Sequence, residues 1–585
     1  MDNLQRKLVE ELLFSEKKKP SFVKQLYFGN FDPKYVMPYP DVSKEETQKT
    51  EAYLKQVEEV VKREVDADWI DRHAEIPEKT LQALGELGIL GLTIPVEYGG
   101  LGMSQRTYCQ AMEIVSGTCG ATALFINAHQ SIGLKALLLF GTEEQKKRWL
   151  PSLAKGKDLA AFALTEPHAG SDASGVETRA VYDPVKNVYI LNGTKQWITN
   201  GAIAKVLTVM AQTEMDTPHG KEDKITAFLV TPDMPGFKVV IPALEKVGMR
   251  GSKTAILEFK DVEVPAENIL GPKGGGLKVC LTVLDYGRTT FGATCTGAAR
   301  VLLQKAISHS QTRFQFKRPL GSLGLVKEKI ARISAYLYAM DATTYMTAGL
   351  VDAEIEDFML ESAILKVFAS DSLWSIIYDT MQIYGGRSFF TDEPLERMMR
   401  DARLNMIGEG SNEVMRVFIA VVGMRDVGMS LKAVLEALKT PLDEISTLKI
   451  FSKSLFKRFA APKIPIESSL LKEQADLLSK NVRRFGFSIL KLLKKYREDV
   501  VEKQLELSRI ATSAIALYSA TAVLSKLDAD IKNKTATDVE IMSGKLYFNI
   551  AMETLNQSLD NLFHPDDEWI EKTADRLTGI KQTYT

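Results

Sequence analysis

The sequence predicts an α+β protein made of an N-terminal helical domain, a middle antiparallel β-barrel domain, a C-terminal helical bundle and an additional C-terminal helical domain. Three observations lead to this fold class. Helical patterning dominates from about residue 45 to 160. Short β-rich runs then follow one another with no helical segment between them. Helical patterning returns after about residue 275 and continues toward the C-terminus.

These changes of pattern also set the expected domain boundaries. An N-terminal arm with several prolines comes first, and the last helical stretch has a break near Pro462 and Pro465. The expected parts are the arm at 1–44, the N-terminal helical domain at 45–160, the β-barrel domain at 161–274, the helical bundle at 275–425 and the additional helical domain at 426–585.

Local signals support the individual elements. Thr142–Gln145 has the form of a capping box, and it precedes a short helix that we expect Pro151 to end. Strands are expected where β-branched and aromatic residues cluster between turn residues. They lie at 188–191, 206–211, 225–230, 237–241 and 255–259. A Rossmann fold would instead alternate strands with helices.

Composition excludes several classes of protein. The 585 residues carry a net charge of −1, which argues against a wholly basic nucleic-acid binder. The four cysteines show no CxxC spacing, so we expect neither a disulfide framework nor a metal site. The uncharged stretch Ile510–Ser525 is short for a membrane span and is better explained as a packed helix. We expect a cytoplasmic protein if the source is bacterial, because the N-terminus lacks the pattern of a signal peptide.

Several motifs could carry chemistry, although each is weak alone. AFALTEPHAGSD at 161–172 could offer backbone N–H groups to an anion, or could form an ordinary solvated turn. In KQWITNG at 195–201, Trp197 and Thr199 lie two residues apart on one strand face. They could flank a planar cofactor, or Trp197 could be a core residue.

Later motifs add a basic segment and an acidic loop. Arg313 in RFQFKRPL could bind a phosphate as a fork, or could belong to a solvated helix end. The glycine pair of MQIYGGR at 381–387 could cap a helix or admit a ligand. Glu409 lies between two glycines in RDARLNMIGEGSNEVMR, where it could be a general base or an exposed loop residue.

Together, and in this order, the motifs resemble the acyl-CoA dehydrogenase family. The resemblance covers residues 50–425 and includes LTEPHAGSD, WITNG, DYGRTTFG, RFQFKRPL, MQIYGGR and RDARLNMIGEGSNE. The segment around AHQSIG and the additional helical region are most similar to the very-long-chain branch. Joint occurrence gives these motifs a specificity that none has alone.

The resemblance implies an activity and a catalytic base. Glu409 matches the residue that removes the α-proton of an acyl-CoA, while FAD takes the β-hydride and trans-2-enoyl-CoA forms. Gly287 stands where some branches carry an alternative base, which favours Glu409. Asp285, Arg288, Gly410 and Ser171 match substrate-side positions.

The resemblance also implies an FAD site shared between subunits. Residues of one subunit that match it are Phe162, Leu164, Thr165, Ser171, Trp197 and Thr199, followed by Ser411 and Glu413 after the base. Residues that match contacts from a second subunit are Arg313, Gln315, Phe316, Gln382, Gly385 and Gly386. A homodimer or larger homo-oligomer is therefore expected.

Some positions depart from the family pattern. Gly408 stands where an aromatic residue is usual, Lys317 replaces a common glycine, Lys327 a common glutamine, and Ser411 the usual threonine. Ala123 and Asn127 occupy positions where very-long-chain members use glycine. Bulkier residues there would shorten the pocket, which favours long-chain acyl groups.

The expected electron acceptor is an electron-transfer flavoprotein. An acyl-CoA oxidase and a non-catalytic assembly paralogue are the alternatives, and the presence of Glu409 argues against the second. Residues 449–503 carry a net charge of +8, and residues 449–459 have a basic row opposite an apolar row. Such a helix can contact an anionic membrane surface, the inner membrane in a bacterium, or can cover a helical bundle.

Overall fold

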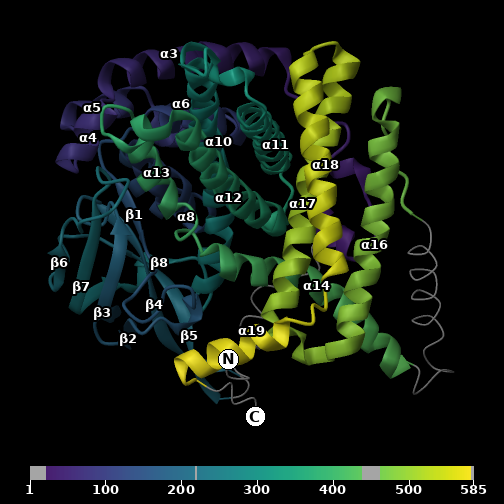
Figure 1. The fold of residues 1–585 in the computed structure, drawn as a ribbon. Coiled ribbons are helices and arrows are strands. Elements are labelled where there is room, and N and C mark those ends of the chain that lie inside the picture. Colours follow the sequence, from purple (N-terminus) through teal and green to yellow (C-terminus); the bar gives the residue numbers. More distant parts are fainter. Residues whose placement is uncertain (1–20, 218–219, 438–460, 581–585) are drawn as a thin grey trace. The chain divides into compact units, whose positions relative to one another are not determined.

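The computed structural model describes residues 21–217, 220–437 and 461–580 (Figure 1). The basic segment 449–459 lies outside these residues. The described chain forms two compact units. One comprises Asp41–Ser411, and the other joins Pro20–Pro40 to Asn412–Thr585. The predicted fold class, helical domains on both sides of a β domain with extra helices at the end, is confirmed.

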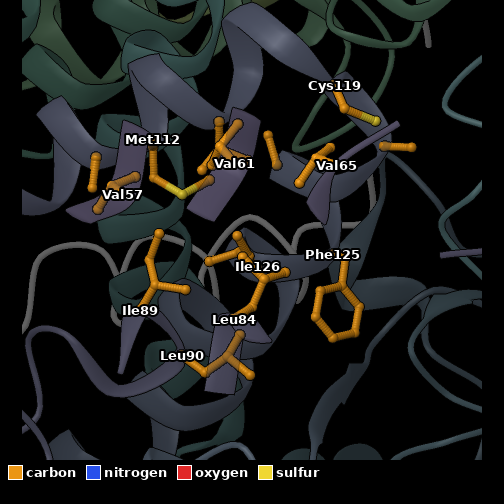
Figure 2. Packing of buried hydrophobic residues seen from close by; sticks show 14 of the residues in the cluster. Val57, Val61, Val65, Leu84, Ile89, Leu90, Met112, Cys119, Phe125 and Ile126 are labelled. Atoms are coloured by element: carbon orange, nitrogen blue, oxygen red, sulfur yellow. The ribbon is translucent and has the colours of Figure 1, made fainter. Parts of the chain in front are cut away.

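The N-terminal helical part of the first unit contributes to two apolar cores, one within its first helices and one shared with the β domain and the long helix that follows it. Figure 2 shows the first of these cores, where Val57 and Val61 of one helix meet Met112 and Ile126 of two others. The helices are α3 (Lys44–Glu64), α4 (Ala67–His73), α5 (Glu78–Glu86), α6 (Gln105–Thr118), α7 (Gly120–Asn127), the π-helix η4 (Ala128–Leu134), α8 (Lys135–Phe140) and α9 (Glu143–Ala154).

Helix α9 shows both a confirmed and a wrong prediction. The capping box is present, because Thr142 accepts from the backbone of Gln145 and the Gln145 side chain accepts from the backbone of Thr142. Pro151 does not end the helix, which continues to Ala154. An interior proline costs a helix roughly 3 kcal/mol. Burial of Leu150, Leu153 and Ala154 on the core-facing side of α9 offsets that cost.

The middle of the unit is one sheet that curls around its own core. Its strands are β1 (Ala160–Ala163), β2 (Arg179–Asp183), β3 (Val188–Thr199), β4 (Val206–Thr217), β5 (Gly220–Val230), β6 (Phe237–Ile241), β7 (Thr254–Pro265) and β8 (Ile269–Leu270). The order is β6-β7-β3-β2-β4-β5-β8, with β1 beside β4. Tyr189 on β3 contacts Phe228 on β5, with ring centroids 5.1 Å apart, although these strands are not neighbours in the order. The two halves of the sheet therefore share one core.

The sheet is mixed rather than wholly antiparallel. Ala160 of β1 pairs with Val206 of β4 in the parallel sense, and β2 meets β4 in the same sense at Arg179 and Gln212. The chain makes the β2–β3 hairpin between β1 and β4, which gives it the length to return in the same direction.

Long helices complete the first unit. They are α10 (Gly276–Thr312), α11 (Gly324–Asp352), α12 (Met359–Tyr384) and α13 (Leu395–Leu404). A small hairpin of β9 (Phe314–Gln315) and β10 (Arg318–Pro319) follows α10, and the 3-10 helix η8 (Gly385–Phe389) follows α12. Helices α10, α11 and α12 pack on one another (Figure 1). Helices α10 and α12, together with the loop after α13, carry the candidate site.

The second unit is helical and includes part of the predicted arm. Its elements are α2 (Phe22–Tyr27), α14 (Asn412–Ala437), α16 (Lys472–Tyr496), α17 (Gln504–Asn533), α18 (Asp538–Asp560) and α19 (Asp567–Thr578). Tyr27 of α2 donates to the carbonyl of Ile419, 2.8 Å away, and its ring packs on Phe485. This arm segment is therefore part of the core of the second unit.

Two helical segments of the described chain are long and apolar enough to cross a membrane, Gly120–Phe140 and Gln504–Asn533. Both are mostly buried inside the fold, at 72% and 89%. The predicted packed helix around Ile510–Ser525 is thus confirmed as the buried middle of α17.

Candidate active site

Glu409 lies in the loop between α13 and α14, in a conformation that few residues other than glycine adopt. Its φ is +61°, and Gly410 beside it has a φ of +94°. The left-handed backbone is costly for a residue with a Cβ, so the surroundings must hold it. Oε2 of Glu409 is buried and has no hydrogen-bond partner among the described residues. A buried carboxylate oxygen without a partner is unusual and is typical of a reactive group.

Two helices hold the loop that carries Glu409. Arg288 on α10 donates from Nε to the carbonyl of Glu409 at 3.4 Å. Lys366 on α12 donates from Nζ to the carbonyl of Gly410 at 2.6 Å. Both bonds are made to backbone carbonyls. They hold the backbone of the loop and do not involve the Glu409 carboxylate.

Arg288 is itself oriented by neighbours. It donates to Oδ1 of Asp285 at 3.2 Å, one turn earlier on α10. The hydroxyl of Ser362 donates to the same oxygen at 3.0 Å. The structure therefore brings three of the predicted residues, Asp285, Arg288 and Glu409, into one connected group.

Burial and charge have opposite effects on the Glu409 carboxylate. Burial raises the pKa of Glu409, and the nearby charges of Arg288 and Lys366 hold that pKa lower than burial alone would. Burial also raises the pKa of Asp285 to about 6 and lowers the pKa of Lys366 to about 8. Lys366 is therefore mostly protonated at neutral pH, and burial leaves the Glu409 carboxyl with a raised pKa.

Gly287 leaves the space that the Glu409 carboxylate uses. A Cβ at Gly287 would lie 3.3 Å from Oε2 of Glu409 and 3.0 Å from Cγ2 of Ile132. Ile132 belongs to the π-helix η4, and π-helical turns often occur at functional sites. The Glu409 carboxylate can therefore occupy its observed position because residue 287 of α10 is a glycine.

A pocket lies between α6, α7, α10 and α13. Ala123 and Asn127 line it, as expected for the positions that set pocket depth. Phe125 does not, because its side chain belongs to the helical core seen in Figure 2. Phe291 of α10 forms another wall, one turn beyond Gly287.

The β domain presents a second group of predicted residues. Lys195 donates to Glu166 at 2.6 Å and to the carbonyl of Leu164 at 2.9 Å. The backbone N–H of Gln196 donates to the carbonyl of Thr165 at 2.9 Å. These bonds tie the loop after β1 to the end of β3, so that Leu164 and Thr165 lie beside the segment containing Trp197.

Trp197 protrudes from the strand that carries it. A register shift between Lys195 and Ile198 interrupts the pairing of β3 with β7, and Trp197 has a φ of +61°. Its side chain is 58% exposed, which excludes the alternative that it is a core residue. An exposed indole beside backbone hydrogen-bonding groups can pack against the planar ring of FAD. Phe162 is buried in β1, Thr199 is half-buried at the end of β3, and Ser171 is exposed in the loop.

A third group lies at the ends of α10 and α12. The ring of His309 stacks on Tyr384 with centroids 4.1 Å apart, which places the start of the hairpin near the glycine pair. Six predicted residues here are exposed: Arg313, Gln315, Phe316, Gln382, Gly385 and Gly386. Ser411 follows Gly410 directly, and Glu413 is exposed in the first turn of α14, which belongs to the second unit.

Sequence reasoning missed Lys366 and Ser362, which bond to the Glu409 loop and to Asp285 respectively. The signal for Lys366 was a single charged residue inside the apolar run Ala363–Ala369 of a helix. A buried lysine needs a partner, and here that partner is the loop of the base.

Comparison with known proteins agrees with this geometry. Family models match four stretches of the chain: acyl-CoA dehydrogenase, N-terminal domain at 47–157; middle domain at 161–262; C-terminal domain at 274–424; and ACAD9/ACADV, C-terminal domain at 469–580. Each of these stretches follows a part of the fold described above.

Individual relatives are similar over most of the chain. The very long-chain specific acyl-CoA dehydrogenase, mitochondrial, of Bos taurus is 36% identical over 514 residues, which are 86% of this chain and 78% of that protein. A solved acyl-CoA dehydrogenase from Bacillus anthracis, complexed with FAD, is 28% identical with a TM-score of 0.76 and covers 94% of this chain and 91% of its own. A chain of a structure described as an electron transferring flavoprotein of Acidaminococcus fermentans is 34% identical, with a TM-score of 0.61 over 66% of this chain and 99% of its own.

Proposed function

The chain belongs to the acyl-CoA dehydrogenase family, and from this premise we propose that it uses FAD to oxidise acyl-CoA thioesters to trans-2-enoyl-CoA in fatty acid β-oxidation. The observation that carries the proposal is the Glu409 carboxylate. Its Oε2 is buried and unpartnered among the described residues, and two cations hold the loop that presents it.

In the proposed reaction, Glu409 takes the proton from the α-carbon of the acyl group. Burial raises the pKa of its carboxyl, which makes the carboxylate a stronger base than an exposed glutamate. Bound FAD, held beside Trp197 and Thr165, would supply the acceptor for a hydride from the β-carbon. The electron pair of the broken α-C–H bond then forms the new double bond. Arg288 and Lys366 align the base by holding the carbonyls of Glu409 and Gly410.

The substrate is proposed to be a long-chain acyl-CoA. The Bos taurus relative is named as specific for very long chains. Ala123 and Asn127 line the pocket. The very-long-chain branch, which this sequence resembles in that segment, uses glycine at both positions. Side chains at these two positions reduce the space for an acyl tail, which supports a preference shorter than that of the relative.

FAD and a second subunit are proposed to complete the site. The Bacillus anthracis structure contains FAD, and in this chain the exposed Trp197 follows Gln196, whose N–H is bonded to the carbonyl of Thr165. Phe314 and Phe316, on the exposed hairpin after α10, are 58% and 84% exposed. Exposed aromatic residues around Arg313 suit a contact with a second copy of the chain, as the family resemblance implies. A homodimer is therefore proposed.

An electron-transfer flavoprotein is the proposed electron acceptor. The Acidaminococcus fermentans similarity supports such a partner. The basic segment 449–459 supports a further proposal made from sequence alone, peripheral contact with an anionic membrane in a cytoplasmic setting.

Anaerobic bleaching of the flavin by acyl-CoAs of increasing length tests the activity. Bleaching, followed by reoxidation with an electron-transfer flavoprotein, supports the dehydrogenase. Rapid reoxidation by oxygen with release of peroxide supports the oxidase instead. Absence of bleaching at every length would exclude both enzymes and favour the assembly paralogue.

The variant Glu409→Gln tests the base directly. It should retain FAD and fold like the wild type, because glutamine fills the same space, but it should not reduce the flavin with substrate. Retained flavin reduction would show that another group is the base.

A further inference from the structure

A chain of buried polar groups joins α12 to the loop of the candidate base. The Ser362 hydroxyl donates to Oδ1 of Asp285 at 3.0 Å, and Arg288 donates to the same oxygen at 3.2 Å. Arg288 in turn donates to the carbonyl of Glu409 at 3.4 Å. Ser362, Asp285 and Arg288 are 0%, 8% and 5% exposed. Water has little access to these groups, so each of them depends on the others for its hydrogen bonds.

The Ser362 hydroxyl has two acceptors for its one proton. The carbonyl of Met359, one turn earlier on α12, lies 3.0 Å from Oγ, the same distance as Oδ1 of Asp285. A hydroxyl donates a single proton, so it can satisfy only one of the two acceptors at a time. A hydrogen bond to an ionised carboxylate is roughly twice as strong as one to a neutral carbonyl. The Ser362 proton therefore points to Asp285 while that carboxyl is ionised.

Protonation of Asp285 would reverse this arrangement. A protonated carboxyl can donate its own O–H to Oγ of Ser362, and the Ser362 proton then turns to the carbonyl of Met359. The neutral carboxyl no longer attracts the guanidinium of Arg288 as an ion does. Because Arg288 holds the backbone of Glu409, the ionisation of Asp285 and the position of the base are connected.

The charges around Asp285 make its ionisation sensitive to a single hydrogen bond. Burial, with a smaller contribution from Asp357, raises the pKa of Asp285 to about 6, against the lowering effects of Arg288 and the Ser362 hydroxyl. Other titratable groups beside it are Tyr286 and Cys280 of α10, and α12 adds the fully buried Glu361 and Lys366 near Ser362. Such a carboxyl is mostly ionised at neutral pH and loses its charge in weak acid. Loss of one bond to the ionised form moves this change toward neutral pH.

We propose that Ser362 is a positioning residue for Glu409: its hydroxyl holds Asp285 in the form that binds Arg288, and Arg288 holds the loop of the base. The inference rests on the proposed function, since it adds a residue to the same site and concerns how that site responds to pH. The hydrogen bonds of Ser362 go to Asp285 and Met359, so it acts on the base only through other residues.

The pH dependence of flavin reduction tests the inference. Anaerobic bleaching by one acyl-CoA on the FAD-loaded full chain gives kcat/KM over a range of about pH 5 to pH 9. In Ser362→Ala, the ionised form of Asp285 loses a hydrogen bond, so the acid limb should move to higher pH by about one unit. The rate should fall about fivefold near pH 6 and approach the wild-type rate above about pH 8.

Further variants on α12 separate the hydrogen bond from packing. Ser362→Thr keeps the hydroxyl and should keep the wild-type limb. Thr380→Val is the matched control, because the Thr380 hydroxyl is also fully buried but bonds to the carbonyl of Ile376 in its own helix at 2.8 Å. It should leave the limb in place. If Ser362→Ala does not fold, Ser362→Cys replaces the hydroxyl by a weaker donor and should move the limb in the same direction.

A double variant shows whether Ser362 acts through Asp285. Asp285→Asn removes the titrating carboxyl, so adding Ser362→Ala to it should not move the limb further. A shift of the same size with and without the Asp285 carboxyl would mean that Ser362 acts by another route, and would overturn the inference.

The remaining outcomes separate this inference from the proposed function. An unmoved acid limb in Ser362→Ala, or an equal loss of rate at every pH, would overturn the positioning role while the dehydrogenase stands. If no acyl-CoA bleaches the flavin of the wild type, the proposed function is wrong, and the inference fails with it.

Discussion

The ammonium of Lys366 lies 2.6 Å from the carbonyl oxygen of Gly410 and donates a hydrogen bond to it. This bond joins the middle of α12 to the residue directly after Glu409. Lys366 is fully buried, and burial lowers its pKa to about 8. Its charge is thus kept at neutral pH, close to the Glu409 carboxylate that is proposed as the base.

Replacing Lys366 by methionine should move the acid limb of the kcat/KM profile to higher pH. Loss of a nearby cation raises the pKa of the Glu409 carboxyl further, so a higher pH is needed to deprotonate it. We expect a shift of about one pH unit and a loss of roughly tenfold at neutral pH. The measurement is the rate of flavin reduction at limiting substrate. A range of about pH 5 to pH 10 includes the acid limb of both the wild type and the variant.

Lys246→Met is the matched control for that variant. Burial lowers the pKa of Lys246 to about 8 as well, but its ammonium bonds to Ser252 and Thr254 instead of the loop of the base. It should leave the acid limb in place. An unshifted limb in Lys366→Met would mean that Lys366 supports only the fold.

Replacing Gly287 by alanine should slow flavin reduction without destabilising the protein. The new Cβ would lie 3.3 Å from Oε2 of Glu409 and 3.0 Å from Ile132, so the carboxylate must move. Displacement of a reacting group by a fraction of an ångström is expected to cost roughly tenfold in rate. Alanine within a helix is at the same time more favourable than glycine by about 1 kcal/mol.

The control for this substitution is Gly324→Ala, at the first residue of α11. A Cβ there meets nothing within 4 Å, so the rate of flavin reduction should not change. Stopped-flow bleaching and thermal unfolding measure the two effects separately. A Gly287→Ala enzyme as fast as the wild type would show that the carboxylate does not need this space.

Much of the site could be predicted from the sequence because its residues lie in short motifs. The motifs name Asp285, Arg288 and Glu409, and the structure connects them through hydrogen bonds. The positive φ of Glu409 agrees with its place between two glycines, since such segments accept unusual backbone. The order of helical and β-rich segments along the sequence was sufficient to predict the order of the domains.

Other features depend on contacts between segments that are far apart in the chain. The partner of Lys366 lies 44 residues away, and no local pattern identifies it. The parallel pairing of β1 with β4 depends on how the chain returns to the sheet. Pro151 stays within α9 because tertiary burial outweighs a local preference. The bond between Ser362 and Asp285 joins positions 77 residues apart, so it can be recognised only when the packing of α10 and α12 is known.

The basic segment allows a prediction from sequence alone. Reversing Lys449, Lys453 and Lys457 to glutamate removes the charged row from residues 449–459. If this row binds anionic lipid, co-sedimentation with vesicles containing phosphatidylglycerol should fall, since each basic residue near such a surface contributes about 1 kcal/mol. Vesicles of phosphatidylcholine alone are the control. Equal sedimentation of both proteins would count against membrane contact through this segment.

The buried ion pair between Lys195 and Glu166 should control both stability and FAD retention. Their side chains are 0% and 4% exposed, and Nζ lies 2.6 Å from Oε1. Burial lowers the pKa of Lys195 to about 8, which still leaves it charged at pH 7. Glu166→Gln would leave this charge buried without a counter-charge, which is expected to cost about 3–5 kcal/mol of unfolding free energy.

The pH dependence of that pair has a definite sign. Burial raises the pKa of Glu166, but Lys195 and the N–H groups of Thr178 and Glu177 outweigh it, so the pKa is lowered overall. A carboxyl whose folded pKa is depressed contributes stability above its unfolded pKa, about 4.3, and loses it as pH falls through the folded value. Wild-type protein should therefore lose stability below about pH 4.3 more steeply than Glu166→Gln.

Denaturant unfolding at pH 7 and in acid, with FAD content measured in parallel, checks this prediction. The double variant Glu166→Leu with Lys195→Met removes both charges and should recover much of the stability lost by Glu166→Gln. It should still release FAD more readily than the wild type, because Lys195 no longer fixes the carbonyl of Leu164. Unchanged FAD content in every variant would show that the loop after β1 does not depend on this pair.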